Sequence, residues 1–223
     1  MMTERIYKSQ IFSATHAPFD LRLQYGTMRY HSFTKDDPFL NMNHINKVEF
    51  DKFDERESTL FIFAWAENKT GGKRELISAV RLIPTVLDYD LEADSWSYLT
   101  EGLNLPKTPE IFEYSRWVAQ PKPRTPCQIC TSRLGIELYH LGQRLGIKQF
   151  IGVATTALTQ YMKNKGLTLE SLTAPISTDR DDDTLEVYIQ DLDLAFMASA
   201  YKKYARYTSK EQSSQVLAQA SSA

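Results

Sequence analysis

The stretch TLFIFAWAENKTGGKRELISAVRLIP (59–84) decides the fold. Its two apolar parts, 59–66 and 75–84, are rich in β-branched and aromatic residues and predict two strands. The sequence NKTGGK between them is typical of a hairpin turn, so the strands should pair antiparallel. Pro84 closes the second strand, because proline has no N–H to donate to a sheet.

Strands and helices alternate after this hairpin. Strands are predicted at 112–119, 148–155, 168–176 and 184–192, and helices at 90–103, 128–147 and 156–167. Before the hairpin, helical spacing predicts a helix at 18–33, followed by a long polar loop at 34–47. Residues 1–17 are expected to form a loose arm. The pattern predicts a three-layer α/β/α fold with a mixed sheet, in a single domain of residues 1–207 with a disordered tail at 208–223.

Composition limits the classes of function. The chain has 223 residues, and 42% of them are apolar, which is enough for a globular core. Its net charge of −2 gives no support for a nucleic-acid partner. No apolar run approaches the roughly 18 residues of a membrane-spanning helix, and the first residues lack the apolar core of a signal peptide. We therefore expect a cytoplasmic protein without a membrane span.

Cys127 and Cys130 form the chain's one Cys-x-x-Cys sequence. A zinc site would need two further ligands, and of the four histidines only His140 is near in sequence. A redox pair is one alternative. We expect two reduced thiols at the start of a helix and no metal site.

Charged residues occur where core strands are predicted. Asp51 and Asp54 are three residues apart, Arg81 lies inside AVRLIP, and Glu113 and Arg116 are again three apart. Side chains alternate along a strand, so Glu113 and Arg116 share a face only if a bulge separates them. Taken singly, each charge could instead lie at an exposed edge or in a structural ion pair.

Together these residues resemble the motifs of the acyl-homoserine lactone synthases, over about residues 25–167. The first block of matching positions comprises Arg29, Phe33 and Phe39. The second is the acidic sequence VEFDKFD, with Glu49, Asp51, Phe53 and Asp54. RLIPT with Arg81, then Trp96, then Glu113, Ser115, Arg116 and Trp117 complete the set. Phe39 and Trp96 depart from the family pattern, which usually has tryptophan and phenylalanine there.

The resemblance implies a fold like that of the GNAT acyltransferases, in which two central strands splay apart and admit the pantetheine arm of a thioester. It implies transfer of a fatty acyl group from acyl carrier protein to the amine of S-adenosylmethionine (SAM). Lactonisation would then release methylthioadenosine and an N-acyl-homoserine lactone, a quorum-sensing signal. The resemblance leaves open acyl-coenzyme A as the donor.

The two chemical steps suggest roles for the matching residues. Arg29 and Arg116 suit the SAM carboxylate because a guanidinium can hold both of its oxygens. Asp51 and Asp54 suit the ammonium and sulfonium, and Phe33, Phe39 and Trp96 suit the adenine and sulfonium. Glu113 is the predicted general base, with Glu49 behind it. Arg81 would hold the acids in place; for Arg81 and Asp54 a purely structural ion-pair role is the alternative.

Two further groups of residues are predicted around the thioester. The acyl chain is expected to meet Gly152, Val153, Leu138 and Met162, and glycine at the position where a family threonine marks preference for 3-oxo chains favours unsubstituted chains. Docking of the acidic carrier protein is assigned to Arg144, Lys148, Lys163 and Lys165. The alternative for these cations is complementation of helix dipoles.

Three rival functions share parts of this pattern. One is a SAM-independent N-acyltransferase, such as an N-acyl amino acid synthase. The second is an inactive relative that binds acyl carrier protein or a lipid. The third, an acetyl-coenzyme A acetyltransferase, is disfavoured because the proline-rich stretch AQPKPRTPCQICTSRLG lacks the glycines of a pyrophosphate loop.

Overall fold

One mixed sheet of eight strands organises the protein. The computed structural model describes residues 5–34, 47–120, 124–177 and 184–193, and of residues 34 and 124–132 it describes the backbone only. The strands are β1 (Arg5–Ser13), β2 (Leu60–Asn68), β3 (Glu75–Pro84), β4 (Ile111–Ala119), β5 (Gln149–Thr155), β6 (Leu169–Ser171), β7 (Ile176–Ser177) and β8 (Thr184–Asp191). Their order is β1-β2-β3-β4-β5-β8-β6, with β7 also paired to β8. Among these described strands, β4 and β5 are the one parallel pair.

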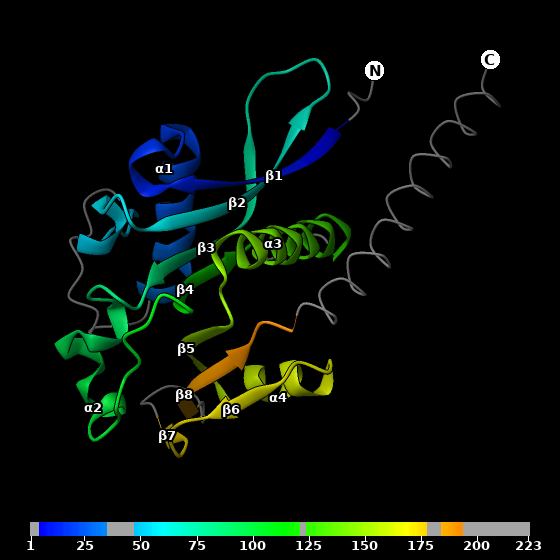
Figure 1. Ribbon diagram of the computed structural model, residues 1–223. Coiled ribbons are helices and arrows are strands. Elements are labelled where there is room, and N and C mark those ends of the chain that lie inside the picture. Colours follow the sequence, from blue (N-terminus) through cyan, green and yellow to red (C-terminus); the bar gives the residue numbers. More distant parts are fainter. Residues whose placement is uncertain (1–4, 35–46, 121–123, 178–183, 194–223) are drawn as a thin grey trace.

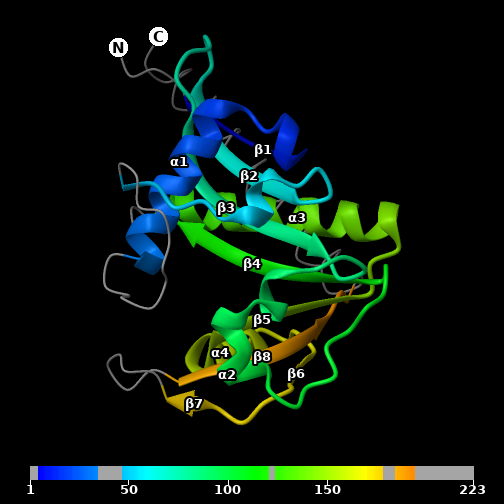
Figure 2. The ribbon, with the colours of Figure 1, turned by 90° about the vertical axis from the view of Figure 1, so that its left-hand side faces the viewer.

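Helices cover both faces of the sheet, as the predicted three-layer fold requires (Figures 1 and 2). The helices are α1 (Phe19–Arg29), α2 (Ser97–Thr100), α3 (Arg124–Leu145) and α4 (Thr156–Asn164). Short turns are η1 (Ala14–His16), η2 (Tyr30–Thr34), η4 (Lys52–Glu55), η5 (Asp90–Glu92) and η6 (Asp94–Trp96). Helices α1 and α2 lie on one face, and α3 and α4 lie on the other.

Strand β2 shows how its side chains divide between the two faces. Ile62 and Ala64 pack with Leu138 and the rest of the α3 side. Phe61 and Phe63 point the other way and pack with Tyr25 of α1. This alternation buries both faces of the central strand, which explains why 59–66 is nearly all apolar. The hairpin to β3 is confirmed, and Gly71 and Gly72 take positive φ values in its turn.

The N-terminal prediction was wrong. Residues 5–13 form β1, which pairs antiparallel with the whole length of β2. The strand lies at the edge of the sheet, so its side chains are half-buried or exposed and its sequence, RIYKSQIFS, is largely polar. An edge strand needs only one apolar face. The alternation of apolar and polar residues in this segment is weak, so the sequence pattern does not identify it as a strand.

Segment 90–103 also differs from its prediction. It holds the turns η5 and η6 and the four-residue α2, where one short helix was expected. Leu91 and Leu99 are buried and pack in the apolar cluster with Ile83 and Ile111 of the sheet, so the segment follows the sheet surface in short turns. The helix predicted at 128–147 begins four residues earlier, at Arg124.

The parallel pair β4 and β5 separates after three residues. Ile111, Phe112 and Glu113 pair with Gln149, Phe150 and Ile151, and the strands then part. Beyond that point β4 continues to pair with β3 and β5 with β8. The expected splay of two central strands is confirmed in the described residues, and we call this place the fork.

Within the described ranges, no helix is long and apolar enough to span a membrane. Most of the predicted loop at 34–47 and all of the predicted tail at 208–223 lie outside the described residues. The domain limit at residue 207 therefore stays a prediction.

Candidate active site

A bulge in β4 brings the two charges of FEYSRWVA to one face of the sheet. Ser115 pairs with Arg81 and Val118 with Ala79, so Arg116 and Trp117 together oppose the single residue between them on β3. Arg116 has φ +54°, a left-handed conformation that is costly for a residue with a Cβ. Strain of this kind concentrates at functional sites.

The bulge changes the direction of the side chains that follow. Trp117 packs on the α3 side with Tyr114, while Arg116 points to the α1 side and approaches Glu49 and Asp90. Glu113 also faces this side, because it accepts hydrogen bonds from the η5 turn. The predicted bulge between Phe112 and Trp117 is therefore confirmed.

The acidic sequence VEFDKFD folds as a turn, and not as part of a strand. Asp51 caps η4 by accepting from the Phe53 N–H at 2.8 Å, and Asp54 accepts from the Asp51 N–H at 2.8 Å. A tight 3₁₀ turn places residues three apart on the same side, which brings both carboxylates together.

Gly26 lets the segment before this turn lie close to α1. A Cβ on Gly26 would come within 2.5 Å of Val48 and 3.1 Å of the Glu49 carbonyl oxygen. The Glu49 N–H donates to the Gly26 carbonyl at 3.0 Å. This contact places the Glu49 side chain beside Arg29, one turn further along α1.

Arg29 is the fully buried centre of an ion-pair network. Its Nε and Nη2 donate to both Glu49 oxygens, with the Nη2 bond at 2.6 Å. Its Nη1 donates to both Asp54 oxygens at 2.7 and 2.8 Å, and its Nη2 also reaches Asp51 at 3.2 Å. Every donor group of the guanidinium is thus occupied by protein carboxylates.

Arg81 is the second fully buried arginine. It donates from Nη1 to both Asp51 oxygens at 2.6 and 2.7 Å and to Asp54 at 3.1 Å. It also donates from Nη2 to Asp90 at 2.9 Å and from Nε to Ser115 at 3.1 Å. Arg81 therefore links the η4 turn, the η5 turn and strand β4.

Arg116 lies at the edge of this network. It reaches Glu49 at 3.4 Å, Asp51 at 3.6 Å and Asp90 at 3.1 Å. Its side chain is 8% exposed and those of Asp51 and Asp90 are 17% and 7% exposed, whereas Arg29, Arg81, Glu49 and Asp54 are at 0%. The side that a ligand could reach is made by Arg116, Asp51 and Asp90.

Acids outnumber bases in the network. Four carboxylates, those of Glu49, Asp51, Asp54 and Asp90, pair with three guanidiniums, so the cluster is net negative and favours a cationic ligand. Burial alone would raise the pKa of Asp51, but Arg81, Arg29 and Arg116 outweigh it and hold that pKa below its usual range. Burial likewise opposes charge on Arg29, yet the carboxylates of Asp54 and Glu49 raise its pKa.

Glu113 is 2% exposed and differs from the other acids in its partners. Its two oxygens accept the backbone N–H groups of Asp90 at 2.8 Å and Leu91 at 3.1 Å. Burial, with a further contribution from the nearby Asp90 charge, raises its pKa to about 8. Glu113 therefore anchors the η5 turn and holds a proton more tightly than an ordinary carboxyl group.

The predicted aromatic residues are only partly brought to the network. Phe33 lies beneath Arg116, with the guanidinium carbon 5.9 Å from the ring centre. Trp96 is half-buried, packs on the cluster that contains Phe53, and stacks with Tyr98 at 6.4 Å. Phe39 lies outside the described residues.

The predicted acyl-chain residues do not share one wall. Leu138 belongs to the core under α3, whereas Val153 packs on the opposite face of the sheet with Ile151. Gly152 lies at the fork, where an added Cβ would come within 2.7 Å of the Tyr114 carbonyl oxygen and 3.2 Å of the Tyr188 hydroxyl. Met162 is half-buried on α4.

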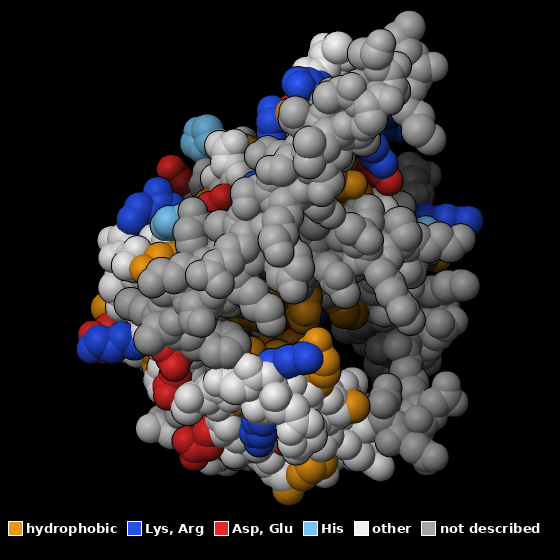
Figure 3. Space-filling view, turned by 90° about the vertical axis from the view of Figure 1, so that its right-hand side faces the viewer, with side chains coloured by type: hydrophobic (Ala, Val, Ile, Leu, Met, Phe, Trp, Pro, Cys, Tyr) orange, Lys and Arg blue, Asp and Glu red, His pale blue; other side chains and the backbone are white. Residues whose placement is uncertain are grey.

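The predicted docking cations are exposed, and several have local partners. Lys148 pairs with Glu110 at 2.6 Å, Lys163 donates to the Ser171 hydroxyl at 3.3 Å, and Lys165 lies over the Tyr161 ring. Arg144 is in the last turn of α3. On the face in Figure 3, the coloured Lys and Arg side chains are scattered and form no single patch.

Two residues of the site were missed by sequence reasoning, Asp90 and Tyr25. Asp90 bridges Arg81 and Arg116, but DYDLEAD contains three aspartates and nothing in the sequence separates Asp90 from Asp88 or Asp94. Tyr25 falls within the predicted helix 18–33, where an aromatic residue gives no sign of a site, yet its hydroxyl donates to the Arg116 carbonyl oxygen.

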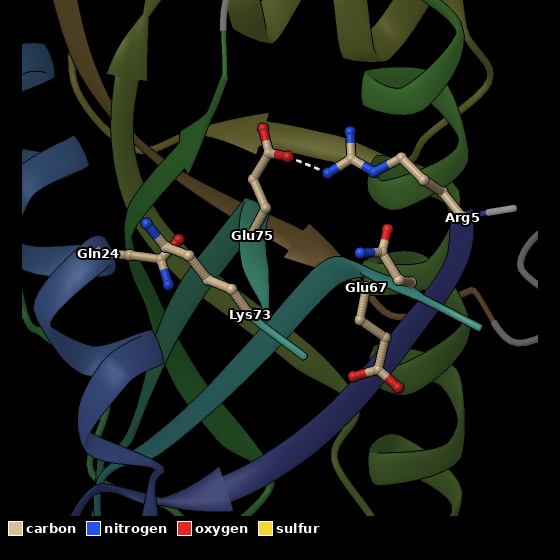
Figure 4. Close-up of a pocket in the computed structure, with 6 residues that line it drawn as sticks. Arg5, Gln24, Glu67, Lys73 and Glu75 are labelled. Carbon is tan, nitrogen blue, oxygen red and sulfur yellow. Dashed lines mark hydrogen bonds and ion pairs between the residues drawn. The ribbon is translucent and has the colours of Figure 1, made fainter. Parts of the chain in front are cut away.

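A surface hollow elsewhere on the molecule is less suited to a ligand. Its lining residues are Arg5, Gln24, Glu67, Asn68, Lys73 and Glu75 (Figure 4). Arg5 pairs with Glu75 and Lys8 pairs with Glu67, so charges there neutralise one another. The hollow lies at the start of β3, away from Arg81. Among the described residues, no group of three or more His, Cys, Asp or Glu is placed to hold a metal ion.

Comparison with known proteins places this geometry in a structural context. No protein-family model and no curated protein sequence matches the chain. Among solved structures, the chain is similar to BjaI, a CoA-dependent acyl-homoserine lactone synthase solved with SAM and isopentyl-CoA, over 90% of each chain with a TM-score of 0.73 and 17% identity. It is similar to the acyl-homoserine lactone synthase LasI over 86% of this chain and 91% of that one, with a TM-score of 0.69 and 16% identity.

TofI, solved in a ternary complex with an inhibitor and methylthioadenosine (MTA), is a third structural neighbour. The likeness covers 86% of this chain and 96% of TofI, with a TM-score of 0.63 and 21% identity. The resemblance first drawn from Arg29, Asp51, Arg81 and Arg116 thus has a structural counterpart. The chain has the GNAT-like fold that these acyl-homoserine lactone synthase structures share.

Proposed function

We propose that the protein is an acyl-homoserine lactone synthase that joins a fatty acyl group to the amine of SAM and releases methylthioadenosine. The observation that carries the proposal is the bulge at Arg116. It places Glu113, Ser115 and Arg116 on one face, beside a net negative ion-pair network and at the fork of β4 and β5. The similarity to solved synthases supports it.

The reaction needs a cationic amine next to a thioester. SAM carries an ammonium, a sulfonium and one carboxylate, so its net charge is positive and complements the acidic excess of the network. The thioester would enter at the fork, where β4 and β5 stop pairing with each other after Glu113 and Ile151. After the ammonium loses a proton, amine attack forms the amide bond and expels the thiol. The SAM carboxylate then attacks its own γ-carbon, which closes the lactone and breaks the C–S bond to release methylthioadenosine.

The three arginines take different roles in this proposal. Arg116, at the edge of the network, would hold both oxygens of the SAM carboxylate with its planar guanidinium group. Arg29 and Arg81 have their donors occupied by Glu49, Asp51 and Asp54. We therefore assign them to keeping the acids in place, and Asp51 to the cationic part of SAM. Phe33, beneath Arg116, suits a stacking contact with the ligand.

Glu113 remains the proposed general base, with Glu49 behind it. A pKa raised to about 8 suits proton abstraction near neutral pH. Both Glu113 oxygens already accept N–H groups of the η5 turn, so a proton would reach it through a bridging water. Glu49 is completely buried against Arg29, which makes it the less accessible of the two.

The direct test uses the purified protein with SAM and matched acyl donors, acyl carrier protein and acyl-coenzyme A. Mass spectrometry should detect an N-acyl-homoserine lactone and an equal amount of methylthioadenosine. Acyl transfer to an amino acid without SAM would indicate the rival N-acyltransferase instead. Binding of acyl carrier protein without any turnover would indicate an inactive relative. Comparing the two donors shows whether the protein depends on acyl carrier protein or on coenzyme A. The comparison is needed because BjaI, a structural neighbour, is CoA-dependent.

A further inference from the structure

Among the described residues, one carboxylate oxygen in the ion-pair network has no hydrogen-bond donor. Within the described part of the chain, both oxygens of Glu49, Asp51, Asp54 and Glu113 accept at least one hydrogen bond. Among the described residues, Asp90 accepts a side-chain hydrogen bond at Oδ2, from Arg81 at 2.9 Å, and the same oxygen forms an ion pair with Arg116 at 3.1 Å. Its Oδ1 has no protein partner there, although the residue is 5% exposed.

Asp90 Oδ1 is not among the fully buried side-chain atoms without a partner, which in the described residues are Thr59 Oγ1 and Arg133 Nε, so it lies at the accessible edge of the network. The position of Asp90 is nevertheless tightly fixed. Glu113 accepts its N–H and that of Leu91, and two guanidiniums hold Oδ2. The oxygen is therefore held in one place and left open at the ligand-accessible edge beside Arg116.

We propose that Asp90 Oδ1 accepts a hydrogen bond from the ammonium of the amine substrate and so fixes the attacking nitrogen at the fork. The assignment rests on the proposed function, in which SAM supplies that amine. It adds to the site a substrate-binding residue between the two arginines, and it gives Glu113 a second role as the group that positions Asp90. In this arrangement Arg116 receives the carboxylate and Asp90 the ammonium of one α-amino acid group.

The substitution Asp90→Asn tests this assignment because the arginines dictate how the amide must turn. Arg81 donates to Oδ2 and the Arg116 guanidinium is ion-paired with the same oxygen, so the asparagine carbonyl oxygen should face both arginines and the –NH₂ group should take the place of Oδ1. The variant keeps the side-chain volume of Asp90 and the oxygen that lies between Arg81 and Arg116. It replaces the acceptor by a donor that repels an ammonium.

The experiment measures binding of SAM and of its desamino analogue, which keeps the carboxylate, sulfonium and adenosine, by calorimetry. We expect Asp90→Asn to raise the SAM Kd by about 10-fold or more and to change the analogue's Kd by less than about 3-fold. Asp90→Glu, which restores a carboxylate, should recover part of the SAM affinity. Asp88→Asn is the matched control, since that side chain is 84% exposed and two residues away.

Each contrary result has a distinct meaning. An equal loss of both ligands in Asp90→Asn would mean that Asp90 only supports Arg116, and it overturns the assignment. Unchanged SAM affinity, or an Asp90→Glu variant no better than Asp90→Asn, overturns it as well. If the unmodified protein binds no SAM, the proposed function fails and this assignment fails with it.

Discussion

The hydroxyl of Tyr25 donates a 2.8 Å hydrogen bond to the carbonyl oxygen of Arg116. Tyr25 is fully buried in α1, and Arg116 is the left-handed residue of the β4 bulge. The bond therefore fixes the strained backbone from which the Arg116 guanidinium extends. The same tyrosine ring lies against Arg29, whose guanidinium carbon is 5.1 Å from the ring centre.

Removing only the Tyr25 hydroxyl should loosen Arg116. We expect Tyr25→Phe to lower the free energy of unfolding by about 1–2 kcal/mol, because a buried carbonyl loses its donor. We also expect several-fold weaker SAM binding, measured by calorimetry, because the Arg116 guanidinium is then less well positioned. Tyr161→Phe, at an exposed position, is the control. Lower stability with unchanged SAM affinity would show that the bond serves folding alone.

Much of the fold could be predicted from local patterns. The hairpin at 59–84 has a continuous apolar run, a glycine turn and a closing proline, and each feature acts within a few residues. The edge strand β1 was missed because its stability comes from pairing with β2, some 50 residues away, and not from its own weak alternation. Long-range pairing of this kind leaves little trace in one sequence.

The candidate site also combines features that local sequence predicts with features that depend on distant contacts. The spacing of Glu113 and Arg116 was enough to require a bulge, because strand alternation is a strict geometric rule. Asp90 could not be found this way. Its role depends on which of three nearby aspartates the chain turns inward, and that is decided by the Glu113 contacts to the η5 backbone.

Replacing Arg116 by lysine separates charge from geometry. Lysine keeps the positive charge and has the same backbone strain, but its single nitrogen cannot reach Glu49, Asp51 and Asp90 together. We expect Arg116→Lys to raise the SAM Kd by about 10-fold or more, with a matching fall in kcat/KM for lactone formation. The control is Arg74→Lys, whose guanidinium pairs with Asp20 on the surface. A SAM affinity in Arg116→Lys equal to that of the unmodified protein would rule out a two-point contact between the guanidinium and the SAM carboxylate.

Glu113 should make stability depend on pH in a direction unusual for a carboxyl group. Its pKa is raised to about 8 in the folded protein, so the folded state binds more protons than the unfolded state between about pH 4.5 and 8. Stability from this group is complete below that window and is lost as pH rises through it. Thermal or urea unfolding at pH 5, 6, 7 and 8 measures the effect.

Glu113→Gln removes this titration. The amide keeps one accepted N–H bond and loses the other, so we expect the variant to be less stable by about 1–3 kcal/mol at pH 5. The deficit should shrink as pH rises, by at most about 1.4 kcal/mol per pH unit. Lactone formation should fall while SAM still binds. A deficit that stays constant from pH 5 to 8 would contradict the raised pKa, and normal turnover would remove Glu113 as the base.

Gly152 should control access to the fork. An added Cβ would come within 2.7 Å of the Tyr114 backbone oxygen, which cannot move aside like a flexible side chain. We expect Gly152→Ala to push β5 away from β4, to lower stability by about 1–3 kcal/mol and to reduce turnover of the acyl donor. SAM binding should change little, because the ion-pair network is built from other strands and turns. Equal losses in SAM binding and acyl transfer would mean a general disruption of the sheet.

The cations near the end of α4 provide a test of carrier-protein docking. Lys163 and Lys165 are exposed and form no ion pair among the described residues, whereas Lys148 is already paired with Glu110. The double reversal Lys163→Glu and Lys165→Glu should raise the KM for acyl carrier protein several-fold, mostly through slower association, and the effect should weaken at high salt. The KM for acyl-coenzyme A and the Kd for SAM should not follow the same trend. Lys69→Glu, an exposed lysine in the β2–β3 turn, controls for net charge. An unchanged KM would leave these lysines as helix-end and surface residues only.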